Sequence, residues 1–225
     1  MFGPALFVAT FTLEGWLRPG YNARRMFVSE LALGPCGWIQ CFNFVVFGAL
    51  FLVFARGVAA DFQDGKASRA GPILLAIIGF SLLVSGFFVM DPVTTLPDQM
   101  SWHGKLHMFF GALVFSLSPI SCFVFLRRFR EDARWRSLQW WTLAAGTITA
   151  AALVVLSVGP TRPPAVPNAF NEWNGLVQRT ILIPYFSWIF TFALLLRRRM
   201  VSAEAATMTG SRPSYASPGL DSNLH

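Results

Sequence analysis

Hydrophobic residues make up 54% of this 225-residue chain and charged residues only 13%, which is about half the charge of a soluble domain. This composition excludes an ordinary soluble domain and favours an all-α integral membrane protein whose first partner is the lipid bilayer. The formal net charge of +7 does not indicate a nucleic-acid partner, because the basic residues fall in short clusters between apolar runs rather than on one surface.

Six apolar runs approach the ~20 residues that a helix needs to cross a bilayer. In chain order they are residues 2–17, 37–58, 71–90, 106–126, 138–158 and 176–196. The first run reaches only about 25 Å, but it has neither the basic leader nor the cleavage site of a signal peptide, so we expect a retained helix. The sequence therefore predicts a six-transmembrane-helix bundle over residues 1–198. Residues 199–225 have no apolar period and are expected to form a disordered cytoplasmic tail.

The distribution of lysine and arginine predicts the orientation of this bundle. With six spans, both termini share one side with the second and fourth loops, and that side carries twelve basic residues against five on the other. Cytoplasmic loops carry the excess of lysine and arginine. The N and C termini are therefore expected in the cytoplasm, and the chain in the inner (plasma) membrane as a multi-pass protein.

Ionisable residues far apart in the chain are predicted to meet in the outer leaflet. The stretch "FFVMDPVTTLPDQMSWHGKLHMFFGALVF" brings Asp91, His103 and His107 to the junction of two predicted spans. Glu14 lies at the outer end of the first span, and Arg179 begins the last span beside Gln178. Such groups usually face the bundle interior and pair with each other. We therefore expect an outward-opening polar pocket, with Glu14 paired to Arg179 and Asp91 in contact with His107 or His103.

The same residues also have plainer interpretations. Asp91 precedes a proline and fits a turn that stops the third span, and Asn43 fits a hydrogen bond between helices. His103 and His107 share one helical face, as paired metal ligands do, and Asp91 could complete a set of three ligands. We predict no cofactor, and keep a divalent metal on Asp91, His103 and His107 as an alternative to a structural polar cluster.

Four motifs, "EGWLRPGYNARRMFVSELALGPCGWIQCFNFVVFG", "GFFVMDP", "HGKLH" and "GLVQR…W", resemble in this order the bacterial membrane family catalogued as domain of unknown function 998. The similarity runs from residue 3 to about 196. The resemblance implies a six-helix bundle and brings no established activity, substrate or cofactor. It also implies a shared polar set at the matching positions, namely Glu14, Arg18, Tyr21, Ser29, Asn43, Asp91, His107, Gln178 and Arg179.

These observations favour a non-enzymatic membrane protein that binds or senses a small ligand or a lipid headgroup in its outward-facing pocket, where Arg18 or Arg179 would meet an anionic group. One alternative is a metal-dependent intramembrane lipid hydrolase with Asp91, His103 and His107 as its centre. The chain is distantly similar to the hydrolase superfamily that includes alkaline ceramidases, but it has no third membrane histidine. A second alternative is a transporter or proton relay, against which the apolar residues below Asn43 argue.

Overall fold

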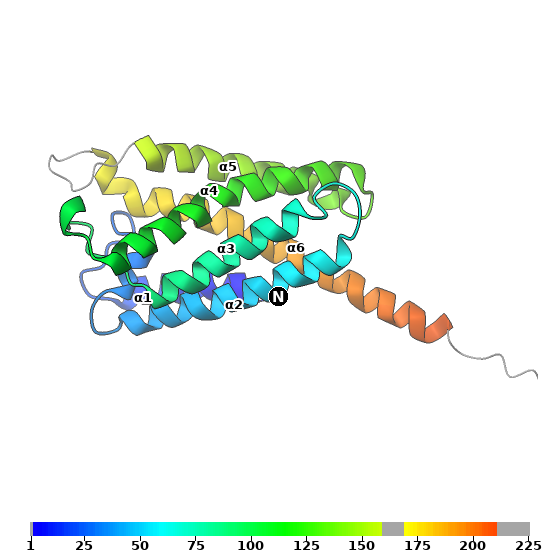
Figure 1. The fold of residues 1–225 in the computed structure, drawn as a ribbon, viewed down its shortest axis with the longest axis horizontal. Coiled ribbons are helices and arrows are strands. Elements are labelled where there is room, and N and C mark those ends of the chain that lie inside the picture. The colour runs from blue at the N-terminus through cyan, green and yellow to red at the C-terminus, as the bar shows by residue number, and fades with distance from the viewer. Residues whose placement is uncertain (1, 159–168, 211–225) are drawn as a thin grey trace, which may run out of the picture.

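The computed structural model describes residues 2–158 and 169–210, with side chains described to residue 158 and from 171 to 202 (Figure 1). Within these ranges the chain is helical, with loops between the helices and no strand. The α-helices are α1 (Gly3–Leu17), α2 (Gly37–Asp61), α3 (Ala70–Phe87), α4 (Trp102–Glu131), α5 (Gln139–Val158) and α6 (Asn174–Gly210). Short 3₁₀ helices lie between them, η1 (Val28–Ala32), η2 (Pro97–Gln99), η3 (Arg136–Leu138) and η4 (Ala169–Trp173).

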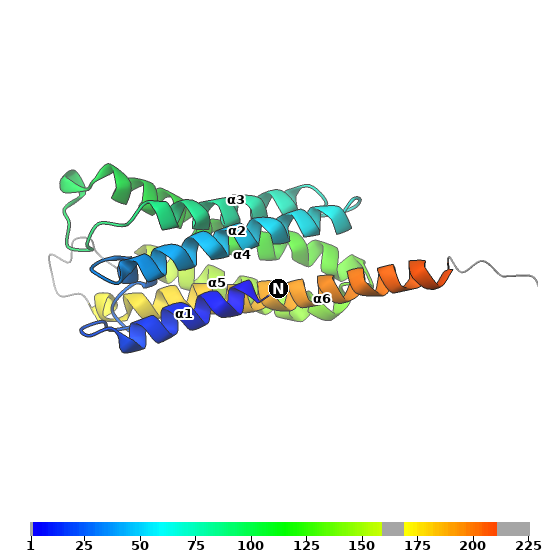
Figure 2. The ribbon, with the colours of Figure 1, turned by 90° about the horizontal axis from the view of Figure 1, so that it is seen from below.

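The six α-helices form an elongated bundle closed into a ring. Each helix packs against the next one along the chain, and α6 also packs against α1, which closes the ring. Figures 1 and 2 show the helices running up and down along one common direction. We call the end formed by the first turns of α2, α4 and α6 the η1 end, because η1 packs there against α1, α2 and α6. The opposite end carries the arginine-rich α4–α5 connection and is called the arginine end.

Five of these helices are long and apolar enough to cross a membrane, namely α2 to α6. Helix α1, with 15 residues, is not among them, since it extends only about 22 Å at 1.5 Å per residue. It begins halfway along the bundle, where Gly3 lies against Phe47 and Leu50 of α2 (Figure 2). The bundle thus has the expected number of helices, and five of them have spanning length, as is typical of a multi-pass membrane protein.

Helix α6 continues well past the predicted end of the last span. It runs from Asn174 to Gly210 and projects beyond the arginine end (Figure 1). The predicted disordered tail at 199–225 is therefore helical in its first part, and residues 211–225 lie outside the described residues. The segment "RRRMVSAEAA" explains the extension, because arginine, methionine, alanine and glutamate are all strong helix formers.

Glycines bring α2 and α3 into close contact. A Cβ atom on Gly48 would lie 2.4 Å from the backbone nitrogen of Leu83, and one on Gly86 would lie 2.7 Å from the carbonyl oxygen of Cys41. Small residues let helix backbones approach in a membrane, where van der Waals packing replaces the hydrophobic driving force. These glycines therefore fix the α2–α3 pair as one wall of the bundle.

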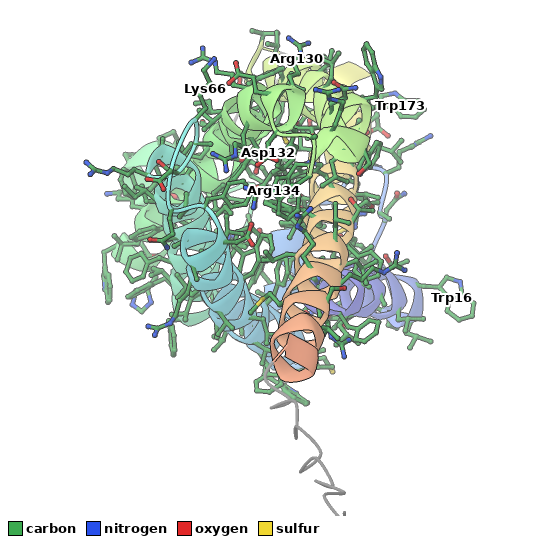
Figure 3. All side chains as sticks on the ribbon, turned by 90° about the vertical axis from the view of Figure 1, so that its right-hand side faces the viewer. Trp16, Lys66, Arg130, Asp132, Arg134 and Trp173 are labelled. Carbon is green, nitrogen blue, oxygen red and sulfur yellow. The ribbon has the colours of Figure 1, made fainter. Side chains whose placement is uncertain are left out.

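Exposed tryptophans lie near both ends of the bundle. Exposed tryptophans at the η1 end are Trp16, Trp38, Trp102 and Trp173, and Trp140 is exposed at the arginine end. Trp16 and Trp173 project from the side of the bundle in Figure 3. Tryptophan is enriched at the two membrane–water interfaces, where its amphipathic ring sits among the headgroups. This distribution is typical of helices that cross a bilayer.

The loop between α4 and α5 is folded tightly onto the arginine end. Asp132 lies 2.7 Å from Arg134 and 3.2 Å from Arg128, and the guanidinium of Arg128 covers the ring of Phe62 (Figure 3 labels Asp132 and Arg134). Hydrogen bonds from Arg134 lower the pKa of Asp132 to about 2. Trp135 is fully buried beneath this network. The basic loop is therefore a structured cap rather than a loose cluster of charges.

Candidate functional site

The connection between α1 and α2 is held down by Arg18. Its Nη1 donates a hydrogen bond to the carbonyl oxygen of Leu31 at 2.6 Å, and its Nη2 donates to that of Leu33. The same guanidinium lies 3.8 Å from the carboxylate of Glu14, one turn earlier on α1. Arg18 therefore ties the end of α1 to η1 through the backbone of the loop.

Arg179, at the start of α6, holds the same loop from the other side. Its Nη1 donates to the carbonyl oxygens of Ala23 at 2.8 Å and Met26 at 3.0 Å, and its Nη2 donates to the Tyr21 hydroxyl at 2.6 Å. The Tyr21 hydroxyl in turn donates to the carbonyl oxygen of Phe27 at 2.9 Å. Burial raises the pKa of Tyr21, so the hydroxyl keeps the proton that this hydrogen bond requires.

Two further contacts position η1 itself. The side-chain oxygen of Gln178 accepts a hydrogen bond from the backbone nitrogen of Val28 at 2.7 Å. The carboxylate of Glu30 accepts one from the backbone nitrogen of Phe27 at 2.7 Å, at the N-terminus of η1. Because buried backbone donors require partners, these contacts explain how a short 3₁₀ helix is held across the end of the bundle.

A cavity of about 450 Å³ lies beneath η1, between the helices. Its volume falls in the usual range of ~300–1,000 Å³ for small-molecule sites. The walls are mainly apolar and include Phe7, Phe44, Leu82, Val114 and Leu182, all of them buried. Most polar side chains lie toward the η1 end, at Ser29, Ser85, His107, Ser157 and Gln178, and Ser116 lies further along α4. An apolar chamber with polar groups at one end suits a ligand that has an apolar body and a polar tip.

His107 is held in a defined orientation at the cavity wall. Its Nδ1 lies 2.7 Å from the carbonyl oxygen of Phe88, at the end of α3. A carbonyl oxygen can only accept, so Nδ1 carries the proton. The ring also meets that of Phe44 edge to face at 6.1 Å. His107 thus joins α3 and α4 and also lines the cavity.

The three candidate metal ligands lie around the first turns of α4. Asp91 accepts a hydrogen bond from the backbone nitrogen of Ser101 at 2.8 Å, next to the N-terminus of α4, and a Cβ atom on Gly104 would lie 2.1 Å from its carboxylate. His103 is exposed with its ring against Trp102 at 3.8 Å. The contact of Asp91 with His107 or His103 stays a prediction. The residues with described placement include no group of three or more His, Cys, Asp or Glu that could hold a metal.

Glu14 has a different partner from the one expected. It pairs with Arg18 and not with Arg179, whose guanidinium is directed at the loop carbonyls. The reason is local: Arg18 is one helical turn away on the same helix face. Neither carboxylate oxygen of Glu14 accepts a hydrogen bond from the described part of the chain. Asn43 donates to the carbonyl oxygen of Phe7 at 3.2 Å and thus joins α1 to α2.

The structure divides the nine predicted pocket residues into three groups. The residues that line the cavity are Ser29, His107 and Gln178. Those that hold the loop above it are Arg18, Tyr21 and Arg179. Those that lie elsewhere in the η1 half of the bundle are Glu14, Asn43 and Asp91. The sequence analysis did not predict the apolar walls of the cavity. The signal in the sequence was polar residues within the apolar runs, such as Ser85 and Ser157, which line the cavity.

Comparison with known families gives a clear assignment. The family model described as "Protein of unknown function (DUF998)" matches residues 1–195. The match covers most of the chain, so the chain belongs to this family. No curated protein matches the chain, and no solved structure does.

Proposed function

We propose that this DUF998 family member is a multi-pass protein of the inner (plasma) membrane that binds a small amphipathic molecule in the cavity beneath η1. The observation that carries the proposal is the cavity itself, with its apolar walls and its polar η1 end. Of the described residues that line it, only His107 has an ionisable side chain. Recognition by hydrogen bonds to a neutral polar group therefore fits better than capture of an anion.

Arg18 and Arg179 have another role in this proposal. Arg18 and Arg179 each bind several backbone carbonyls of residues 23–33, and neither lines the cavity. Charge-assisted hydrogen bonds of this kind are stronger than neutral ones. The arginines therefore hold the roof of the cavity, and Ser29, His107 and Gln178 contact the polar tip of the ligand.

The distribution of charge supports an orientation. Basic residues gather at the arginine end, where Lys66, Arg130 and Arg134 lie around the α4–α5 connection (Figure 3). The positive-inside rule then puts the arginine end in the cytoplasm. The cavity consequently lies in the outer half of the bundle, with the ligand's polar tip toward the outer interface.

A photoreactive medium-chain alkanol, which diffuses freely in water and lipid, tests the proposal. After irradiation of the purified full chain in vesicles, peptide mapping should find the label on Leu82 and Leu182, which are buried and line the cavity. Labelling confined to lipid-facing residues would refute the proposal.

A blocking variant and a matched control make this test specific. Gly111 lines the cavity, and a Cβ atom there would meet nothing within 4 Å. Gly111→Trp should therefore fill the cavity without disturbing the backbone, and labelling of Leu82 should be lost. Ile120→Trp is the control, because Ile120 is exposed on the same helix and does not line the cavity.

A further inference from the structure

We propose that the occupant of the cavity is one acyl chain of a membrane lipid, which passes sideways from the bilayer through an opening between α4 and α5. This inference rests on the proposed function and names the ligand class. The lipid's glycerol and ester region would lie at Ser29, His107 and Gln178, with its headgroup outside at the membrane interface.

One stripe of α4 forms an edge of the opening. Met108, Ala112 and Ser116 follow each other at intervals of four residues and so share one helix face. All three line the cavity and are exposed. On α5, Ser157 likewise lines the cavity and is exposed. Because the other walls named above are buried, these exposed lining residues mark the place where we infer that the cavity opens.

Helices α4 and α5 separate toward the η1 end. Near the arginine end they touch, and a Cβ atom on Gly146 of α5 would lie 3.0 Å from the Cβ of Cys122 on α4. Figures 1 and 2 show the two helices drawing apart from there toward the η1 end. Gly111, which lies three turns nearer that end than Cys122 and lines the cavity, has open space where a Cβ atom would lie. The opening is therefore a wedge between two helices of spanning length.

The opening lies at the depth of the lipid tails. Ala112 follows the start of α4 by ten residues, which is about 15 Å along the helix axis. The hydrocarbon core is ~30 Å thick, so a mouth around Ala112 faces acyl chains and not water. The bilayer lipid is thus the molecule that meets this opening at the highest concentration.

The inner surface of the cavity suits hydrocarbon. Ser85 and Ser157 donate their hydroxyl protons to carbonyls of their own helices, Ser81 and Leu153, both at 2.8 Å. Serines satisfied in this way add little polarity to the wall. Opposite the opening, Phe44 and Leu182 form a buried back wall. A chain that enters between α4 and α5 passes Ser116 and Ser157 at the opening and then meets mainly apolar atoms.

The experiment compares two photoreactive probes on the full chain in phosphatidylcholine vesicles. One is a phospholipid with a diazirine near the end of an acyl chain, and the other is the free alkanol used above. The readout is labelling of Leu82 and Leu182, which a lipid on the outer surface of the bundle cannot reach. We expect the phospholipid to label both residues, with loss of that labelling in Gly111→Trp and retention in Ile120→Trp.

Each outcome has a distinct meaning. Labelling of the buried residues by both probes, blocked by Gly111→Trp, supports a lipid chain as occupant. Labelling by the alkanol alone overturns the lipid inference and leaves the proposed function standing. Labelling by neither probe overturns both. Phospholipid labelling that persists unchanged in Gly111→Trp, while Ile120→Trp abolishes it, overturns the assignment of the opening to α4 and α5.

Discussion

Replacement of Arg18 by alanine should be among the most damaging single changes at the η1 end. The side chain is only 19% exposed, and it binds the carbonyls of Leu31 and Leu33 while it lies 3.8 Å from Glu14. Its removal leaves the Glu14 carboxylate without any ion pair among the described residues and frees two loop carbonyls.

The expected magnitude follows from these contacts. Removal of one partner of a buried ion pair costs about 3–5 kcal/mol, mainly because the other charge stays buried without compensation. A hydrogen bond to a charged group contributes about 1.5–3 kcal/mol, and these contributions overlap because one guanidinium makes them all. We therefore expect Arg18→Ala to lower the free energy of unfolding by about 3–5 kcal/mol.

Tryptophan fluorescence during unfolding in mixed micelles of mild and denaturing detergent measures this loss. Arg56→Ala is the matched control, since Arg56 is an exposed arginine of α2, and it should change stability by less than about 0.5 kcal/mol. Adding Glu14→Gln to Arg18→Ala should recover part of the loss, because no buried charge then remains. Stability of Arg18→Ala within error of the control, or strict additivity of the two changes, would refute the reasoning.

Three further predictions concern other parts of the bundle. Gly48→Ala should lower the stability of the protein by about 1–3 kcal/mol, because the new methyl group overpacks against α3. In Gly57→Ala the new Cβ would lie 3.6 Å from its nearest neighbour, so this variant should be neutral or gain up to about 1 kcal/mol from helix propensity. Thermal unfolding of the two variants compares them. Tyr21→Phe should cost about 1–3 kcal/mol in the same assay, since it removes the hydroxyl that joins Arg179 to the loop. The pKa of Asp132 is lower in the folded chain than in the unfolded one, so its contribution is present above the unfolded pKa near 4 and is lost as pH falls toward about 2. Because Arg134 is half-exposed and screened, that contribution is about 1 kcal/mol, and unfolding measured from pH 5 to pH 2 should show it in the wild type but not in Asp132→Asn.

The absence of the expected difference would count against each of these predictions. Equal stability of Gly48→Ala and Gly57→Ala would mean that the α2–α3 contact can relax. A Tyr21→Phe variant as stable as the wild type would mean that the hydroxyl does not hold the loop. An Asp132→Asn variant with the same acid dependence as the wild type would assign that dependence to another carboxylate.

The sequence by itself determined the number and type of the elements. Apolar runs of membrane length bounded by polar loops have few other outcomes, because backbone polar groups in lipid must be satisfied within a helix. The five longer runs accordingly appear as α2 to α6, and the ends of α2, α3 and α5 lie within a few residues of the predicted boundaries. Most errors lie at helix ends, where α4 begins earlier and α6 ends later than hydropathy indicated, since helix propensity and capping, not apolarity, decide those positions.

Only the tertiary structure decided what the polar residues do. Sequence placed Glu14, Arg18 and Arg179 at one level, but the choice of partner depends on side-chain reach and on which carbonyls the loop presents. Arg179 is thereby committed to the backbone at Ala23 and Met26, and Glu14 to Arg18. The cavity depends on how α4 and α5 pack, with a close contact at Gly146 and a separation toward the η1 end (Figure 1). Such a crossing is a property of two packed surfaces, and no single stretch of sequence carries it.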